Sequence, residues 1–224
     1  MFLKRSYEHE ILDDFSIKDE RVDTALKELK TINSYLGGNN ISLSGIKILS
    51  GKETRLTILD VGAGASDILL NMKRDYDHLQ IHCLDINQRA CSYLKKHSDD
   101  VKVICGDILN LPFNINTPFD IIHASLFLHH FNEEEIKEII VTLLKLCNRG
   151  IIINDLRRSI FAWMGIKILS SLFSKSREVK YDGPLSVRRG FIKKDWMFIL
   201  KGIAAENYII KRKWAFRWLI VIYK

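Results

Sequence analysis

The sequence predicts a single α/β domain with a mostly parallel sheet and helices on both faces. Strand-like and helix-like segments alternate over residues 55–154, which is the pattern of consecutive βαβ units. In ILDVGAGASD, an apolar run ends at an acid and two glycines follow, as in a tight turn from strand to helix. With 224 residues, the chain is long enough to bury one substantial core.

Five parallel strands and the helices between them follow from the apolar pattern. The strands are expected at 55–61, 79–84, 101–105, 119–125 and 151–154, and the first two helices at 66–74 and 87–97. The clearest helix follows the fourth strand, where Asn132 and Glu135 form a capping box. Its apolar residues recur at helical spacing, and Gly150 is expected to end it after the basic Lys145 and Arg149.

The two ends of the chain differ from this alternation. A helix at 194–201 precedes two β-rich runs, 207–211 and 216–223, which are close enough to form an antiparallel hairpin. Near the start, an apolar helical stripe ends at Gly37 and Gly38 and comprises Val22, Leu26, Leu29, Ile32 and Leu36. We therefore expect residues 1–54 to form a helical extension or lid and residues 55–224 to form the main domain.

The composition of the chain indicates its cellular compartment and the classes of molecule that it could bind. The four cysteines have no metal-ligand spacing, so we expect a reduced, cytoplasmic protein without a metal site. The charged N-terminus excludes a signal peptide, and the apolar segment 160–173 is too short to span a bilayer. Residues 145–224 carry 18 Lys and Arg against 5 Asp and Glu. Such a basic surface attracts nucleic acid, anionic lipid or an acidic acceptor, or is simply solvated.

The glycine loop favours a ligand without phosphates. A dinucleotide-binding loop prefers a third glycine three positions after the second, where this chain has Asp67. A carboxylate there would repel phosphate and suits a positively charged ligand.

The strands and closing hairpin resemble the class I S-adenosylmethionine-dependent methyltransferases over residues 55–224. The resemblance implies a Rossmann-like, seven-stranded sheet with an antiparallel C-terminal strand, and S-adenosylmethionine as cofactor. It assigns Asp60 to the cofactor's ammonium, Asp85 to its ribose hydroxyls and Asp107 to its adenine. The remaining cofactor-binding residues that it implies are Gly62, Ala63, Gly64, Ile86, Ile108 and Ser125. Ser66 stands where many members have a third glycine.

A narrower resemblance concerns small bacterial methyltransferases found beside type III polyketide synthases. It rests on EILDD at 10–14, INSYLGG at 32–38, NDLRRS at 154–159 and DGPLSVRRGF at 182–191. It implies O-methylation of a small, lipophilic phenolic or polyketide-type acceptor. An acceptor-side insertion is expected at about 156–192, and its apolar stretch 159–174 either lines the acceptor pocket or packs in the core.

Two histidines and a group of arginines are candidates for acceptor chemistry. A phenol must lose its proton, and histidine has the suitable unperturbed pKa, so His129 and His130 are candidate general bases; a packing role is the alternative. Arg157, Arg188 and Arg189 are candidate acceptor-binding residues or part of the basic face. RNA methylation on that face and a non-catalytic cofactor-binding module remain alternatives. The apolar stretch flanked by cations also suits peripheral contact with an anionic membrane.

Overall fold

The computed structural model describes all residues except 1–3, 16, 18, 54, 74–77 and 112–117. Its centre is a seven-stranded sheet of order β3-β2-β1-β4-β5-β7-β6. The strands are β1 (Leu56–Val61), β2 (Leu79–Asp85), β3 (Val101–Cys105), β4 (Phe119–Ser125), β5 (Cys147–Leu156), β6 (Tyr208–Lys213) and β7 (Arg217–Tyr223).

The first five strands are parallel, and β7 is antiparallel to both of its neighbours, β5 and β6. This confirms the predicted sheet and its closing hairpin. The strand order reverses between β1 and β4, and in open α/β sheets ligands bind outside the carboxyl ends of the strands at such a point.

Helices cover both faces of the sheet. They are α2 (Gly38–Ser50), α3 (Asp67–Lys73) and α4 (Gln88–His97) on one face, and α5 (Glu133–Lys145) and α8 (Lys193–Gly202) on the other. Each face has its own apolar core, one around Leu69 and Ile152 and the other around Ile139 and Trp196. Their side chains are fully or almost fully buried, which makes these cores the main source of stability.

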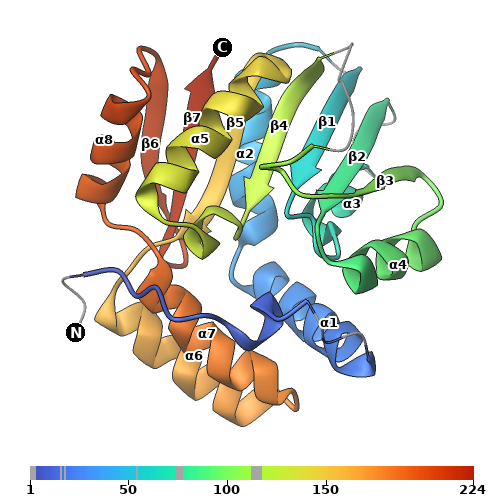
Figure 1. The fold of residues 1–224 in the computed structure, drawn as a ribbon, viewed down its shortest axis with the longest axis vertical. Helices are drawn as coiled ribbons and strands as arrows, with labels where there is room; N and C mark the ends of the chain where they lie inside the picture. Colours follow the sequence, from blue (N-terminus) through green and yellow to red (C-terminus); the bar gives the residue numbers. More distant parts are fainter. Residues whose placement is uncertain (1–3, 16, 18, 54, 74–77, 112–117) are drawn as a thin grey trace.

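A third group of helices lies beyond the carboxyl ends of the parallel strands (Figure 1). It consists of α1 (Glu20–Tyr35), α6 (Ile160–Phe173) and α7 (Arg177–Arg189), together with the N-terminal segment that contains the 3₁₀ turn η1 (Ile11–Asp13). Helix α7 packs against α6, α1 and η1. This group therefore covers the sheet edge at which a ligand is expected.

Most predicted elements are confirmed, and three points are corrected. The capping box of Asn132 and Glu135 is present, but α5 ends at Lys145 and Gly150 lies inside β5, because Cys147 already pairs with Phe119. Helix α2 begins at Gly38, where the sequence pattern predicts only an end, and α7 was not predicted. Residue 74, the expected end of the first helix, lies outside the described residues. Within the described part of the chain, no helix combines the length and the hydropathy needed to cross a membrane.

Candidate active site

The glycine loop after β1 is shaped by two residues with left-handed backbone angles. Gly62 has φ 64° and Gly64 has φ 51°. A Cβ atom at Gly62 would lie 2.1 Å from Cδ2 of Phe127, so only glycine fits at this position. The loop thus lets the backbone approach whatever lies above the ends of β1 and β4.

Two adjoining cavities surround this loop. The larger, of about 290 Å³, lies over the ends of β1 and β2. Among the residues predicted to bind the cofactor, it is lined by Gly62, Gly64, Asp85, Ile86, Asp107 and Ile108. The smaller, of about 140 Å³, is lined by Asp60, Ala63 and Ser125 together with both glycines. The structure therefore brings all nine predicted cofactor residues to the walls of these two cavities, which share Gly62 and Gly64.

Asp85 holds the loop in place. Its carboxylate accepts hydrogen bonds from the backbone N–H of Gly64 at 2.7 Å and of Asn87 at 2.8 Å. Burial raises the pKa of Asp85, although these two N–H groups act in the opposite direction. A carboxylate can accept about four hydrogen bonds, so acceptor capacity remains for a ligand in the cavity.

Asp107 is held by its own turn. Its carboxylate accepts hydrogen bonds from the backbone N–H of Leu109 at 2.9 Å and from the side-chain amide of Asn110 at 3.2 Å. These local bonds fix the carboxylate beside the larger cavity.

Asp60 belongs to a buried polar network beneath the smaller cavity. It accepts hydrogen bonds from Ser66 Oγ at 2.5 Å and from His123 Nδ1 at 2.7 Å, and the other nitrogen of His123 lies 2.8 Å from Ser42 Oγ. Two polar atoms in the wall of this cavity, Asp67 Oδ2 and Ser125 Oγ, are buried and have no hydrogen-bond partner among the described residues. Burial raises the pKa of Asp67. Unpaired groups of this kind are expected where a polar ligand binds.

A third cavity, of about 380 Å³, lies between α1, α6 and α7. Its wall is mainly apolar and includes Leu29 of α1 and Leu36 just after it, Ile166 and Leu169 of α6, and Val179 of α7. Glu10, Leu12, Leu29, Leu126 and His130 line both this cavity and the 290 Å³ cavity. The predicted insertion thus forms the wall of a pocket, and the two cavities meet at these five residues.

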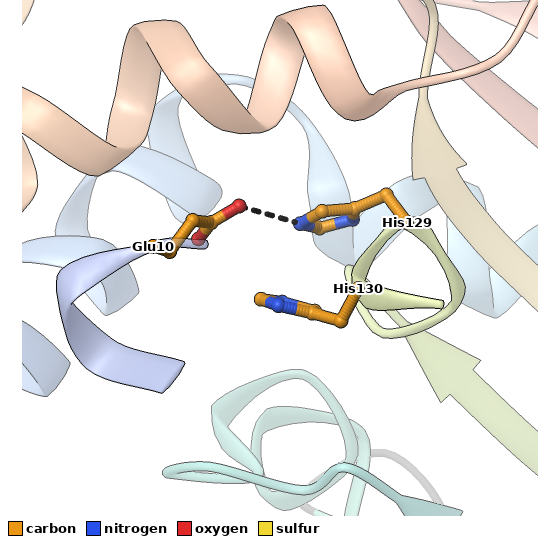
Figure 2. Close-up of side chains that lie close together, drawn as sticks. All are labelled: Glu10, His129 and His130. Atoms are coloured by element: carbon orange, nitrogen blue, oxygen red, sulfur yellow. Dashed lines mark ion pairs between the residues drawn. The ribbon is translucent and has the colours of Figure 1, made fainter. Parts of the chain in front are cut away.

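Glu10, His129 and His130 lie together at this junction, as Figure 2 shows. Nε2 of His129 is 3.6 Å from Oε1 of Glu10, and its Nδ1 is hydrogen-bonded to Asp155 Oδ1 at 2.7 Å. Asp155 also accepts the backbone N–H groups of Leu128 and His129, which fixes the 3₁₀ turn η2 (Leu128–His130). Burial raises the pKa of Asp155, but the neighbouring His129 outweighs it and holds the pKa below its ordinary value.

His130 is paired with acids on the N-terminal segment. Its Nδ1 lies 2.7 Å from Asp13 Oδ1. Burial lowers the pKa of His130, but the carboxylates of Glu10 and Asp13 outweigh it, so the pKa lies above its ordinary value. The charged form of His130 is therefore favoured.

Arginines fasten the N-terminal segment over the histidines. Arg189 donates hydrogen bonds to the carbonyls of His129 at 3.1 Å and His130 at 2.7 Å, and to Asp13 at 2.7 Å. Arg5 donates to the His129 carbonyl at 3.1 Å and to Arg189 O at 2.8 Å. The segment that carries Glu10 is thus tied to the turn that carries the histidines.

The three arginines predicted to bind the acceptor have protein partners instead. Arg189 is engaged as described, and Arg188 pairs with Glu8 at 3.1 Å. Arg157 lines a separate hollow and stacks on Phe216, 5.0 Å from the ring centroid. Within the described part of the chain, none of the three lines the 380 Å³ cavity.

The ligand-capable atoms of Glu10, His129 and His130 lie within 4.8 Å of one another, close enough to hold a metal ion. A cation is already present there, because Nε of Arg189 is 3.8 Å from Glu10 Oε1. The guanidinium of Arg189 neutralises part of the negative charge of Glu10 that would otherwise attract a metal ion.

Glu10 and Asp155 are site residues that the sequence did not single out. Glu10 was noted only within EILDD and Asp155 only within NDLRRS. Asp155 lies one residue before the end of the fifth parallel strand, at the same sheet edge as Asp60 and Asp85, and that position was the available signal. Glu10 reaches the site only through tertiary contacts.

Residues 58–150 match a protein-family model described as a methyltransferase domain. No curated protein sequence matches the chain.

Solved structures with the same fold include several methyltransferases. The plantazolicin methyltransferase BpumL, in complex with a triazolic desmethylPZN analog and SAH, has a TM-score of 0.66 and 21% identity, over 89% of this chain and 76% of that one. Human N-acetylserotonin methyltransferase in complex with SAM has a TM-score of 0.69 and 14% identity, over 98% and 60%. Magnesium protoporphyrin IX methyltransferase from Synechocystis PCC 6803, with bound SAH, has a TM-score of 0.60 and 13% identity, over 93% and 98%. The shared architecture is the Rossmann-like fold of class I methyltransferases.

Proposed function

We propose that this chain is an S-adenosylmethionine-dependent methyltransferase that methylates the hydroxyl oxygen of a small, lipophilic phenolic or polyketide-type acceptor. The observation that carries the proposal is the meeting of a cavity lined by Asp85 and Asp107 with the 380 Å³ cavity, at Glu10, Leu126 and His130. Methyl transfer needs the acceptor in line with the methyl group and protected from water. Two cavities that share lining residues beside two histidines would supply that arrangement.

The cavities of about 290 and 140 Å³ fit the cofactor group by group. Asp85 would accept the two ribose hydroxyls, and Asp107 would accept the adenine amino group. The unpaired oxygens of Asp67 and Ser125, with Asp60 behind them, suit the ammonium and carboxylate of the methionine end. When bound, the cofactor supplies a methyl group on a positively charged sulfur.

The apolar cavity suits an acceptor with a hydrocarbon body and one hydroxyl group. Leu29, Leu36, Ile166, Leu169 and Val179 would bury the body, since burial of apolar surface is favourable at about 25 cal/mol per Å². Glu10 and His130 line both cavities, and His129 lines the apolar one beside them. The hydroxyl would therefore be held at the junction.

His129 is the proposed proton acceptor. Because Nδ1 donates to Asp155, the neutral imidazole has its lone pair on Nε2, at the junction. The acceptor O–H would give its proton to this nitrogen as the oxygen takes the methyl group. His130 is the proposed partner of the developing phenolate, because its charged form is favoured by Glu10 and Asp13.

Incubation with S-adenosylmethionine carrying a labelled methyl group tests the proposal. Simple phenols, resorcinols with increasing alkyl length and total RNA serve as acceptors, and NMR of the product locates the methyl group. We expect O-methylated phenols, with kcat/KM rising with chain length. Methylation of RNA alone would overturn the acceptor class. Tight cofactor binding without transfer to any acceptor would overturn the assignment as an enzyme.

A further inference from the structure

The outer face of α6 carries a continuous apolar stripe. Phe161 is 70% exposed, Ile168 is 58% exposed and Leu172 is 70% exposed, and Met164 lies between them at 47%. Their spacing of three, four and four residues places all four on one side of the helix. An exposed apolar stripe of this kind usually marks a contact surface.

Exposed cations flank this stripe. Residues 157–177 contain no Asp or Glu, and their basic members are Arg157, Arg158, Lys167, Lys175 and Arg177. Lys167, Lys175 and Arg177 are exposed. Lys167 lies over the ring of Trp163, 4.8 Å from its centroid, so an aromatic ring and a charge sit at the margin of the stripe. This combination is complementary to a surface that is apolar inside and negative outside.

The same helix also forms a wall of the apolar cavity. Ala162, Ile166 and Leu169 line the cavity, and Phe161 belongs to both the lining and the exposed stripe. Trp214, in the turn between β6 and β7, also lines the cavity and is 76% exposed. The cavity lining therefore continues onto the exposed apolar surface.

We propose that α6 docks on the surface of an anionic lipid membrane, with Phe161, Met164, Ile168 and Leu172 in the interface and the neighbouring cations on the lipid headgroups. The cavity between α1, α6 and α7 then faces the membrane, and a lipophilic acceptor enters from the lipid. The entry of the acceptor from the membrane rests on the proposed function, whereas the docking of α6 on the membrane does not.

Co-sedimentation of the purified full-length chain with vesicles tests docking in the absence of acceptor. Vesicles of phosphatidylglycerol mixed with phosphatidylcholine should pellet the protein, and vesicles of phosphatidylcholine alone should pellet much less. Binding should fall as salt rises, because salt screens the contribution of the cations. Protein that stays in the supernatant with anionic vesicles at low salt overturns the proposal.

Paired variants locate the surface. Ile168→Ser combined with Leu172→Ser should weaken vesicle binding at least about tenfold, because two apolar side chains no longer enter the interface. Both side chains are exposed, so the melting temperature should stay near wild type. Phe198→Ser on α8, where Phe198 is 56% exposed, is the matched control and should bind as wild type does.

Other outcomes separate docking from its alternatives. If the double variant binds vesicles as well as wild type, α6 is not the docking surface. If light scattering finds a wild-type dimer that the double variant dissolves, the stripe is an interface between two copies and the membrane proposal is wrong. The double variant should still methylate a water-soluble phenol, so loss of docking is distinguishable from loss of the proposed function.

Discussion

Oε1 of Glu10 lies 3.6 Å from Nε2 of His129, and Asp155 is hydrogen-bonded to the other nitrogen of the same ring at 2.7 Å. One imidazole is thus held between two carboxylates at the junction of the cavities. Asp155 fixes the orientation and the tautomer of the ring. Glu10 occupies the side from which an acceptor hydroxyl would approach.

Replacement of Asp155 tests this arrangement. Asp155→Asn keeps the shape but favours the wrong tautomer, with the proton on Nε2. We expect kcat to fall by about 10²–10⁴, the usual contribution of general acid–base catalysis, with the cofactor dissociation constant near wild type. The pH profile of kcat/KM provides the second readout, because removal of the Asp155 charge beside the proposed base should change its shape. Unchanged turnover across the whole pH range would mean that Asp155 only holds the turn.

Asp85 offers a test of the cofactor assignment. Asp85→Asn removes the charge that would accept both ribose hydroxyls, and hydrogen bonds to charged groups contribute about 1.5–3 kcal/mol. Calorimetry should show binding of S-adenosylmethionine weakened about tenfold or more. Asp120→Asn is a matched control, since Asp120 accepts the backbone N–H of Thr57 at 2.8 Å at the opposite end of β1. Equal affinities for both variants would contradict the assignment.

Parallel strands and local caps were the predictable parts of this fold. The Asn132 and Glu135 capping box was predictable because its hydrogen bonds join residues within one turn. Helix α7 was not, because it contains Gly183 and Pro184, which usually interrupt helices. Contacts with distant residues favour it instead, such as Asp182 accepting the backbone N–H groups of Ile11 and Leu12.

The residues of the candidate site likewise divide into those that the sequence pattern predicts and those that it does not. The acids proposed to bind the cofactor lie at or just after the ends of three parallel strands, and strand ends can be recognised from the apolar pattern. Glu10 lies in an irregular N-terminal segment, and only the long-range bonds of Arg5 and Arg189 bring it to the histidines. No periodic pattern encodes contacts of this kind.

Catalysis is expected to be independent of a metal ion. Arg189 already lies beside Glu10, and His130 is paired with Asp13, so the charge at the junction is balanced by protein groups. Dialysis against EDTA should leave kcat within about twofold of the untreated enzyme, far from the loss expected on removing a catalytic metal. An inactive enzyme that recovers on addition of Zn²⁺ or Mg²⁺ would show that Glu10, His129 and His130 are metal ligands.

Asp182 should make stability depend on pH. Burial raises its pKa to about 6, and the nearby Glu10 and Asp13 act in the same direction, against the N–H groups of Ile11 and Leu12. A raised folded-state pKa means that stability is present at low pH and is lost as pH rises through about 6. Relative to Asp182→Asn, the free energy of unfolding of wild type should fall by about 1–3 kcal/mol between pH 4 and 6. Urea titrations across this range measure it, and a flat difference would contradict the burial argument.

Gly62 lies against the ring of Phe127, so the glycine loop beside the proposed cofactor site touches the segment that leads to the histidines. A Cβ at Gly62 would strike the Phe127 ring, and Phe127 directly precedes the turn that carries both histidines. A shift of the glycine loop toward this ring would therefore press on the residue next to the turn that carries the histidines. Cofactor binding at the glycine loop should set the positions of the histidines. This predicts an ordered kinetic scheme in which the cofactor binds first. Acceptor binding measured with and without S-adenosylhomocysteine should show tighter binding in its presence, whereas equal affinities would show that the two sites act independently.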